Sequence, residues 1–229
     1  MKKFSVILLL VVVASAAFAQ QQETRQLAKF NGIRVGEAID VYLKKGDKES
    51  ARVEVDGVNL SDVETEVAGN TLRIQMRSGN YRNHRTVKVH VTYVDIGRIS
   101  SSSAANVFNE EGSTLKTSTL DITCASAGTV ELKVEAESIS IDVASGGGIV
   151  LEGKAKRLTL EASSAGSVDA YNLECETVNA TAASGGSAKV NVTKSLSADA
   201  SSGGSIRYRG NPTTTNTDSS SGGSVKKSS

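Results

Sequence analysis

The chain has 229 residues, a formal net charge of +1 at neutral pH and a hydrophobic fraction of 38%. A charge this close to zero argues against nucleic acid or a strongly anionic surface as the partner. The chain contains no Trp and four Phe. A compact globule of this length normally relies on aromatic side chains for its core. A core of Val, Ile, Leu and Ala therefore indicates a thin, elongated fold such as a solenoid.

Residues 1–19 predict a cleaved export signal. Lys2 and Lys3 precede an apolar run over residues 4–13, and small residues then lead to Ala19. The run is too short to span a bilayer. Cleavage before Gln20 removes both lysines and takes the formal charge from +1 to −1. No later segment is apolar enough to cross a membrane. We therefore expect a chain exported to the periplasm, the cell surface or the medium, with a flexible start over residues 20–27.

A six-residue motif of small residues recurs seven times in the second half of the chain. The copies begin at residues 102, 125, 144, 163, 183, 201 and 220, so their spacings are 23, 19, 19, 20, 18 and 19. Self-similarity at so regular a period indicates a repeat architecture. We predict regular solenoid repeats over residues 101–225, with about 19 residues per rung, and a polar tail over residues 226–229.

Alternation within each repeat predicts strands with one buried face. When the repeats are aligned, equivalent positions form columns. Columns of apolar or small residues precede and follow the motif, and polar columns separate them. The column five residues before the motif holds Leu120, Ile139, Leu158, Val178 and Leu196. Each rung is predicted to be a strand, a corner, a second strand and a polar connection. Parallel stacking of such rungs gives an all-β, right-handed β-helix.

The motif itself predicts a tight corner. Ser holds its second position in all seven copies, and Gly holds its fourth position in six. Because Gly adopts a positive φ at low cost, we expect the fourth position to turn the chain. The serines are predicted to be structural, since His84 and His90 lie outside the repeats and nothing within them would activate a nucleophile.

Residues 28–100 predict a less regular β region. Alternating segments lie at residues 30–45, 52–55, 63–67, 72–76 and 87–93, and no convincing helix is evident. These strands are expected to form the wider, less regular start of the same stack. A separate small β-domain is the alternative.

The basic segment 77–85 is the candidate binding loop. It connects two predicted strands, and binding residues are concentrated on such loops. A solvated connection between the two strands is nevertheless the preferred interpretation, and the segment is the binding loop if the chain has one. The candidate residues are Arg77, Tyr81, Arg82, His84 and Arg85. No Cys, Asp or second His stands at ligand spacing from His84, so no metal site is expected there. His90 is expected to be exposed on the polar face of its strand.

The two cysteines are predicted to be free thiols. An exported chain meets oxidising conditions, so a disulfide must be considered. Cys124 lies in an inward column and Cys175 in the predicted polar connection, 51 residues further on. That is about two and a half rungs, or on the order of 12 Å along the axis, whereas a disulfide needs Cα atoms within about 7 Å. Cys124 is expected to pack as a small buried hydrophobe.

A column of carboxylates supports an enzymatic alternative. Asp142 and Glu161 stand one repeat apart, so stacking would place them roughly 5 Å from each other. Such a pair is compatible with glycoside hydrolysis or with cation binding. A solvated ladder of polar residues is the preferred interpretation. We therefore predict no catalytic, cofactor-binding or metal-binding residues.

The last repeat predicts a polar end to the stack. Thr215, Thr217 and Ser219 occupy columns that are apolar elsewhere, and Lys226 and Lys227 follow. Polar core positions and lysines discourage strand pairing at an open edge. We expect this end to resist polymerisation.

The first half of the chain resembles the head GIN domain of auto-transporter adhesins. The resemblance rests on Phe30-Asn31-Gly32-Ile33-Arg34-Val35 with Ile39-Asp40-Val41, on residues 63–67 before 72–74, and on residues 87–93 followed by Ile96 and Ile99. The later Ser-Gly-Gly-Ser rungs are similar too, so the resemblance covers about residues 28–225. It implies an exported β-helix with an adhesin role, and it carries no functional residues with it.

Two classes of function follow from these patterns. The preferred one is an exported, non-catalytic solenoid that acts as an adhesin or as a binding or scaffold protein of the cell envelope, because a solenoid offers long repetitive faces to extended partners. A surface glycan or an envelope protein would be its partner. The alternative is a polysaccharide lyase or glycoside hydrolase, by analogy with other β-helices.

Overall fold

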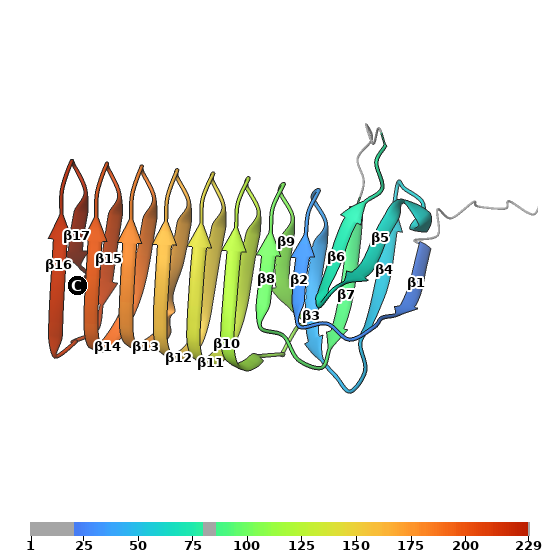
Figure 1. Cartoon of the computed structure of the whole chain (residues 1–229), viewed down its shortest axis with the longest axis horizontal. Coiled ribbons are helices and arrows are strands. Elements are labelled where there is room, and N and C mark those ends of the chain that lie inside the picture. The colour runs from blue at the N-terminus through green and yellow to red at the C-terminus, as the bar shows by residue number, and fades with distance from the viewer. Residues whose placement is uncertain (1–20, 80–85, 229) are drawn as a thin grey trace, which may run out of the picture.

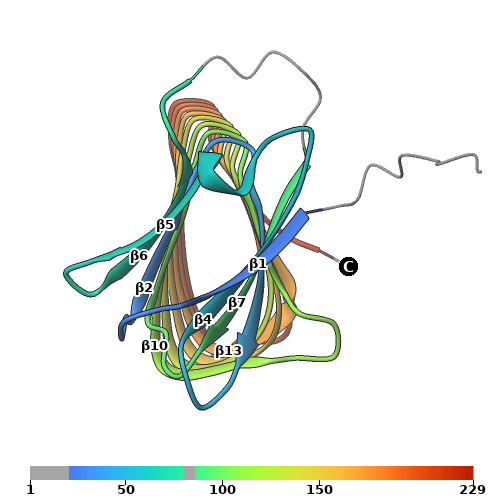
Figure 2. The same cartoon turned by 90° about the vertical axis from the view of Figure 1, so that its right-hand side faces the viewer.

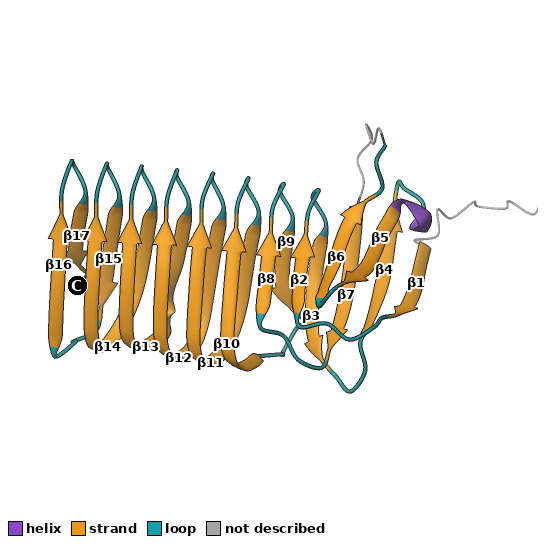
Figure 3. Cartoon of the chain, viewed as in Figure 1, coloured by secondary structure: helices purple, strands orange, loops and turns teal. Residues whose placement is uncertain are grey.

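Stacked strands wind around one continuous hydrophobic core (Figure 1). The computed structural model describes residues 21–79 and 86–228. Strands make up nearly all of the regular structure in this part of the chain, beside a single 3-10 turn, Leu60–Asp62 (Figure 3). In Figure 1 the near strands run upward, the far strands run downward and the rungs advance to the left, which is a right-handed winding. The predicted all-β, right-handed β-helix is confirmed.

Long strands that bend around one side of the solenoid form its regular half. They pair in parallel and in register, so that Ile139 faces Leu158 and Leu158 faces Val178. These columns are buried, which confirms the predicted rung of about 19 residues. The strands are β10 (Leu115–Cys124), β11 (Thr129–Val143), β12 (Gly148–Ala162), β13 (Ser167–Ala182) and β14 (Ser187–Ala200).

The prediction of a polar connection in each rung is wrong, because the strand continues through it. Inward residues alternate there as they do elsewhere, and Val134, Leu173 and Val192 are fully buried. Parallel pairing along this side, continuous between β11 and β12, satisfies backbone hydrogen-bonding groups that an irregular connection would leave to water. Cys175 therefore points into the core instead of lying in a polar segment. Both cysteines are buried free thiols, as predicted.

The corner turns at the second and third motif positions, and the prediction that it turns at the fourth is wrong. In one rung Ser145 has a φ of 51° and Gly146 a φ of 72°. The amide of Gly147 closes the turn on the carbonyl of Ala144 at 2.9 Å, as in a turn with two left-handed central residues. A Cβ on Gly147 would lie 2.7 Å from the carbonyl oxygen of Cys124 in the preceding rung. Glycine at the fourth position thus allows close stacking of the rungs.

The strands β2 and β3 lie inside the stack and not at its end, although they precede the other parallel strands in the sequence. The rung formed by β2 and β3 pairs on one side with β6 and β7 and on the other side with β8 and β9. The strands of residues 28–100 therefore belong to the same sheet and core as the repeats. The parallel strands of these three rungs are β2 (Gly32–Val35), β3 (Asp40–Lys45), β6 (Thr71–Met76), β7 (Thr86–Tyr93), β8 (Arg98–Ser101) and β9 (Asn106–Asn109).

Antiparallel strands cap this end of the solenoid (Figure 1). The strand β5 (Val63–Ala68) pairs with β6, β4 (Ser50–Asp56) pairs with β7, and β1 (Gln21–Gln26) pairs with β4. The sequence predicts a flexible segment over residues 20–27, but β1 holds most of it in the sheet. Arg25 fixes the strand by donating to the carbonyls of Val63 at 2.6 Å and Leu60 at 2.8 Å. The predicted signal peptide, residues 1–19, lies outside the described residues.

The other end of the solenoid is open. The last strands are β15 (Ser205–Arg209), β16 (Thr214–Ser219) and β17 (Ser224–Lys227). All six residues of β16 are exposed, because no further rung covers them within the described chain. That its polar residues discourage polymerisation stays a prediction. Within residues 21–79 and 86–228, no helix has the length and apolar character needed to cross a membrane.

Candidate functional site

The 23-residue spacing between the first two motifs marks an insertion between β9 and β10. Phe108 pairs in register with Glu131, and Leu115 pairs with Val134. Two residues separate Glu131 from Val134, whereas six separate Phe108 from Leu115. The four extra residues are 111–114, and we call them the insertion. They stand out from the lower right of the cross-section in Figure 2.

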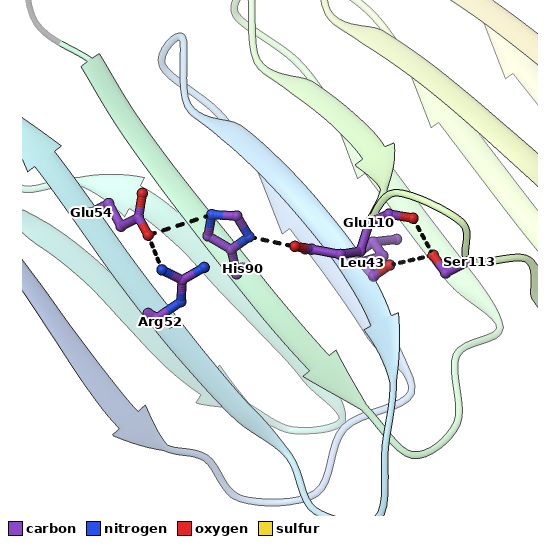
Figure 4. Close-up of polar contacts among 6 residues, drawn as sticks. All are labelled: Leu43, Arg52, Glu54, His90, Glu110 and Ser113. Carbon is purple, nitrogen blue, oxygen red and sulfur yellow. Dashed lines mark hydrogen bonds and ion pairs between the residues drawn. The ribbon is translucent and has the colours of Figure 1, made fainter.

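Short hydrogen bonds hold the insertion in one conformation. The amide of Glu110 donates to the carbonyl of Leu43 at 2.8 Å, and the amide of Ser113 donates to the carbonyl of Glu110 at 2.9 Å. The Ser113 hydroxyl lies 2.6 Å from the Glu110 carbonyl oxygen and 3.2 Å from that of Leu43 (Figure 4). Gly112 takes a φ of 74°, which a side chain would oppose. The surface beside the insertion is therefore formed before any ligand arrives.

The solenoid has two broad sides in Figure 1. We call the side formed by β7, β3, β9 and the first residues of the repeat strands the far sheet, and the side formed by β6, β2, β8 and the last residues of the repeat strands the near sheet. Three aromatic rings stack along the outer face of the far sheet. His90 on β7 and Tyr42 on β3 have ring centroids 5.0 Å apart, and Tyr42 and Phe108 on β9 have centroids 5.5 Å apart. The three residues are paired in register across neighbouring strands. Each stacked pair contributes about 0.5–1.5 kcal/mol beyond its burial. Because Tyr42 covers one face of Phe108, the other face is turned toward Glu131 of the next rung.

Two carboxylates hold His90 in place. Its Nδ1 lies 2.9 Å from the Glu110 carboxylate, and its Nε2 lies 3.7 Å from the Glu54 carboxylate, which also pairs with Arg52 (Figure 4). The imidazole is only 20% exposed. The prediction that His90 is simply exposed is wrong, because β4 and the start of the insertion bring charged side chains over it. The contact with Glu110 links the aromatic stack to the base of the insertion.

Two hollows flank the insertion. The first, which we call the insertion cleft, has a volume of about 380 Å³ and lies over β9, β11 and β12. Phe108, Glu111, Glu131 and Val150 are among its lining residues. Val150 is 42% exposed, unusually high for a large apolar side chain of this protein. The second hollow, of about 560 Å³, lies over β3, β4 and β7 and shares residues 108–111 with the first.

Glu131 lacks the lysine partner that several acidic residues on the outer faces of the solenoid have. Those residues pair with a lysine of a neighbouring rung. Such pairs are Lys116–Glu135, Lys133–Glu152, Lys156–Glu137, Lys189–Asp169 and Lys194–Glu176. The neighbours of Glu131 in register are Phe108 and Val150, and neither can pair with it. Among the described residues, the carboxylates of Glu131 and Glu111 make no ion pair or side-chain hydrogen bond.

Asn109 lies between the two hollows and is incompletely satisfied. It faces Leu43 in register, at an inward position where the other rungs carry apolar residues. Its Oδ1 accepts a hydrogen bond from the amide of Lys133 at 2.5 Å, so the side chain replaces a backbone carbonyl that the insertion has displaced. Its Nδ2 is buried and has no hydrogen-bond partner among the described residues. A buried donor of this kind favours an acceptor at the site, such as an ordered water.

Arg77, the one candidate of the predicted binding loop that lies within the described residues, is not among the residues that line the insertion cleft. Arg77 follows β6 on the near sheet, where its Nε lies 3.3 Å from a Glu64 oxygen. Hydrogen bonds from Gln75 and from Arg77 lower the pKa of Glu64. Tyr81, Arg82, His84 and Arg85 lie outside the described residues, so their part in binding stays a prediction.

The candidate carboxylate pair is exposed, and the two thiols are held in their protonated, unreactive form. Asp142 and Glu161 are neighbours in register, as predicted, and both are exposed on the near sheet. Burial raises the pKa of Cys175 to about 12 and also raises that of Cys124, which disfavours the reactive thiolates. Within residues 21–79 and 86–228, no group of three or more His, Cys, Asp or Glu is placed to hold a metal ion.

The fold defines a β-solenoid with a hollow on one outer face, and comparison with known proteins identifies its family. The profile of the family described as "Putative auto-transporter adhesin, head GIN domain" matches residues 29–212, so the chain belongs to this family. The resemblance drawn from the sequence is confirmed. A search of the curated proteins finds no match.

Solved structures share this fold over nearly their whole length. A putative adhesin from Bacteroides fragilis is 24% identical and aligns with a TM-score of 0.84 over 93% of this chain and 98% of its own. One from Parabacteroides merdae is 19% identical, with a TM-score of 0.73 over 91% and 96% of the two chains. A putative lipid binding protein from Parabacteroides distasonis is 21% identical, with a TM-score of 0.67 over 91% and 97%.

Proposed function

We propose that this protein is an exported, non-catalytic protein of the cell envelope that binds a surface partner through the outer face of its far sheet. The insertion cleft is the observation that carries the proposal. It is a preformed hollow of about 380 Å³ with an apolar side chain, an aromatic ring and unpaired carboxylates on its walls. The fold supports the proposal, because stacked rungs hold these groups in fixed register.

Membership of an adhesin family and the predicted export signal agree with this role. The neighbours named as adhesins share the fold, and the function that their names imply is carried to this chain only as part of the proposal. A protein that meets its partner outside the cytoplasm must first be exported, which is the task predicted for residues 1–19.

The chemistry of the described side chains also favours binding over catalysis. A nucleophile needs a base within hydrogen-bond reach, and here His90 lies between Glu54 and Glu110 and stacks on Tyr42. The corner serines lie in the tight turns of the repeats, whereas His90 lies on β7, and no hydrogen bond joins them among the described residues. The proposed work of the protein therefore depends on the shape and charge of its surface.

The test uses the mature chain, residues 20–229, in two parallel assays. The first measures saturable retention of the labelled protein on isolated bacterial envelopes and on a glycan array. The second measures release of reducing or unsaturated sugar ends from the same glycans. We expect retention without turnover. Loss of retention from both surfaces would refute the proposal.

Turnover would support the enzymatic alternative instead. In that case the double variant Asp142→Asn/Glu161→Gln should abolish it, because these carboxylates are the neighbouring acidic pair on the near sheet. A glycoside hydrolase or lyase activity that survives this double variant would remove that pair from consideration and would still refute the non-catalytic proposal.

A further inference from the structure

The row of outward residues through the insertion cleft alternates apolar and acidic groups. Phe108, Glu131 and Val150 follow one another in register on β9, β11 and β12, so they stand about 4.8 Å apart along the axis. The uncovered face of Phe108 and the exposed side chain of Val150 lie on either side of the Glu131 carboxylate. One negative charge is thus placed between two apolar surfaces.

The charge inside the cleft is negative and incompletely compensated. Glu110, Glu111, Glu131 and Glu152 line it, and among the described residues Lys133 is the one cation on its walls. Lys133 lies 3.7 Å from Glu152, and Glu110 holds His90. Glu111 and Glu131 therefore supply two carboxylates without a cation of their own among the described residues. Charge complementarity requires a ligand that brings a positive group.

We propose that the insertion cleft receives a lysine or arginine side chain from an extended segment of a partner protein in the cell envelope. The inference rests on the proposed binding function and adds the place and the chemistry of recognition. The aliphatic stem of such a side chain packs on Val150 and on the open face of Phe108, while its charged end pairs with Glu131. A cation over the ring of Phe108 gains a further electrostatic attraction.

The same features favour a protein segment over an amino sugar. A sugar amine is bound directly to a ring that carries hydroxyl groups, so it has no apolar stem to cover Val150 and Phe108. A lysine or arginine combines about three or four methylene groups with a terminal charge, which matches the apolar-acidic-apolar row. The second hollow continues the surface across β3, β4 and β7, so an extended chain can lie along several rungs.

The matched pair of variants Glu131→Gln and Asp142→Asn tests the proposal in the mature chain. Both substitutions remove one exposed, unpaired carboxylate from the solenoid, the first in the cleft and the second on the opposite sheet. The probe is a fluorescein-labelled peptide of alternating Gly and Lys residues, measured by fluorescence anisotropy at about 0.15 M salt, where distant charges are screened.

We expect Glu131→Gln to weaken peptide binding at least about tenfold, because a charge-assisted hydrogen bond is lost. Asp142→Asn should change the affinity less than about twofold, and Val150→Thr should weaken it without changing the charge. Equal losses for Glu131→Gln and Asp142→Asn would overturn the proposal, because attraction would then depend on net charge alone. Peptide that binds no better than an uncharged Gly-Ser peptide would overturn it as well.

Two further outcomes separate this inference from the proposed function. A glucosamine oligomer that binds as tightly as the peptide, with the same dependence on Glu131, would overturn the protein segment as the occupant. Glu131→Gln protein that is retained on envelopes as well as the parent would overturn the site and leave envelope binding intact. Thermal unfolding of each variant checks that the solenoid is unchanged, which is expected because both carboxylates are exposed.

Discussion

Replacement of the fourth-position glycine of one corner by alanine should destabilise the solenoid strongly. In Gly147→Ala, the new Cβ would lie 2.7 Å from the carbonyl oxygen and 2.9 Å from the carbonyl carbon of Cys124 in the preceding rung. Both atoms belong to the backbone, so no flexible side chain can move aside. The two rungs must separate locally, and the corner must distort.

The magnitude of the effect follows from the hydrogen bonds at this point. The amide of Ala144 donates to the same Cys124 carbonyl at 3.0 Å. A separation of about 0.5 Å would stretch this bond beyond useful length, which costs about 1 kcal/mol. Overpacking of a rigid contact adds about 1–3 kcal/mol. We therefore expect the free energy of unfolding to fall by about 2–4 kcal/mol.

Gly148→Ala, one residue further on, is the matched control. A Cβ there would meet no atom within 4 Å, and its backbone does not have a positive φ. This variant should be as stable as the parent or slightly more stable, since alanine lowers the entropy of the unfolded chain. Urea unfolding followed by circular dichroism gives the comparison, and hydrogen exchange of β10 and β11 locates the damage. Equal stability of the two variants would refute the argument that this glycine permits close stacking.

Three further predictions concern the thiol, the cap and the insertion. Burial raises the pKa of Cys175 from 9.0 to about 12, so the contribution of this thiol to the free energy of unfolding is complete below pH 9 and is lost as the pH rises toward 12. Between pH 8.5 and 10 the parent should therefore lose about 1 kcal/mol more of its unfolding free energy than Cys175→Ala. In Arg25→Lys the guanidinium contacts with Val63 and Leu60 are lost, so amide exchange of β1 should quicken at least about tenfold while β12 is unaffected. Ser113→Ala removes the hydroxyl bond to Glu110, which should cost about 1 kcal/mol and accelerate exchange of the residue 113 amide, which donates to the carbonyl of Glu110. Parallel pH profiles, unchanged β1 exchange or unchanged exchange of the residue 113 amide would contradict the respective reasoning.

The repeat columns could be predicted because they depend on contacts between equivalent positions. A residue such as Ile139 packs on Leu158 in the next rung, so one alternating pattern, repeated at a fixed period, determines both the strand and its partner. The role of the corner glycine could not be deduced in the same way. A positive φ and a close approach to another rung both select glycine, and only the position of Gly147 over the Cys124 carbonyl separates the two causes.

The spatial order of the first rungs could not be predicted from local sequence patterns. Nothing in the alternation of residues 32–45 indicates that β2 and β3 will lie between β6–β7 and β8–β9. That arrangement depends on pairings between strands about 40 to 65 residues apart, with several equally apolar edges to choose from. The surroundings of His90 depend on pairings of the same kind, since Tyr42 reaches it through the pairing of β3 with β7 and Glu54 through the pairing of β4 with β7.

The cleft lies where the regular repeats meet the irregular first rungs. Regular rungs repeat their side chains, so a surface made from them alone varies little along the axis. The aromatic stack comes from β7 and β3, which precede the repeats in the sequence, and from β9, which contains the end of the first motif, whereas Glu131 and Val150 come from the rungs that follow. The insertion lies at this boundary, where four extra residues leave the buried columns on either side in register. The 23-residue spacing is visible in the sequence, and it marks the place where the surface of the otherwise regular solenoid changes.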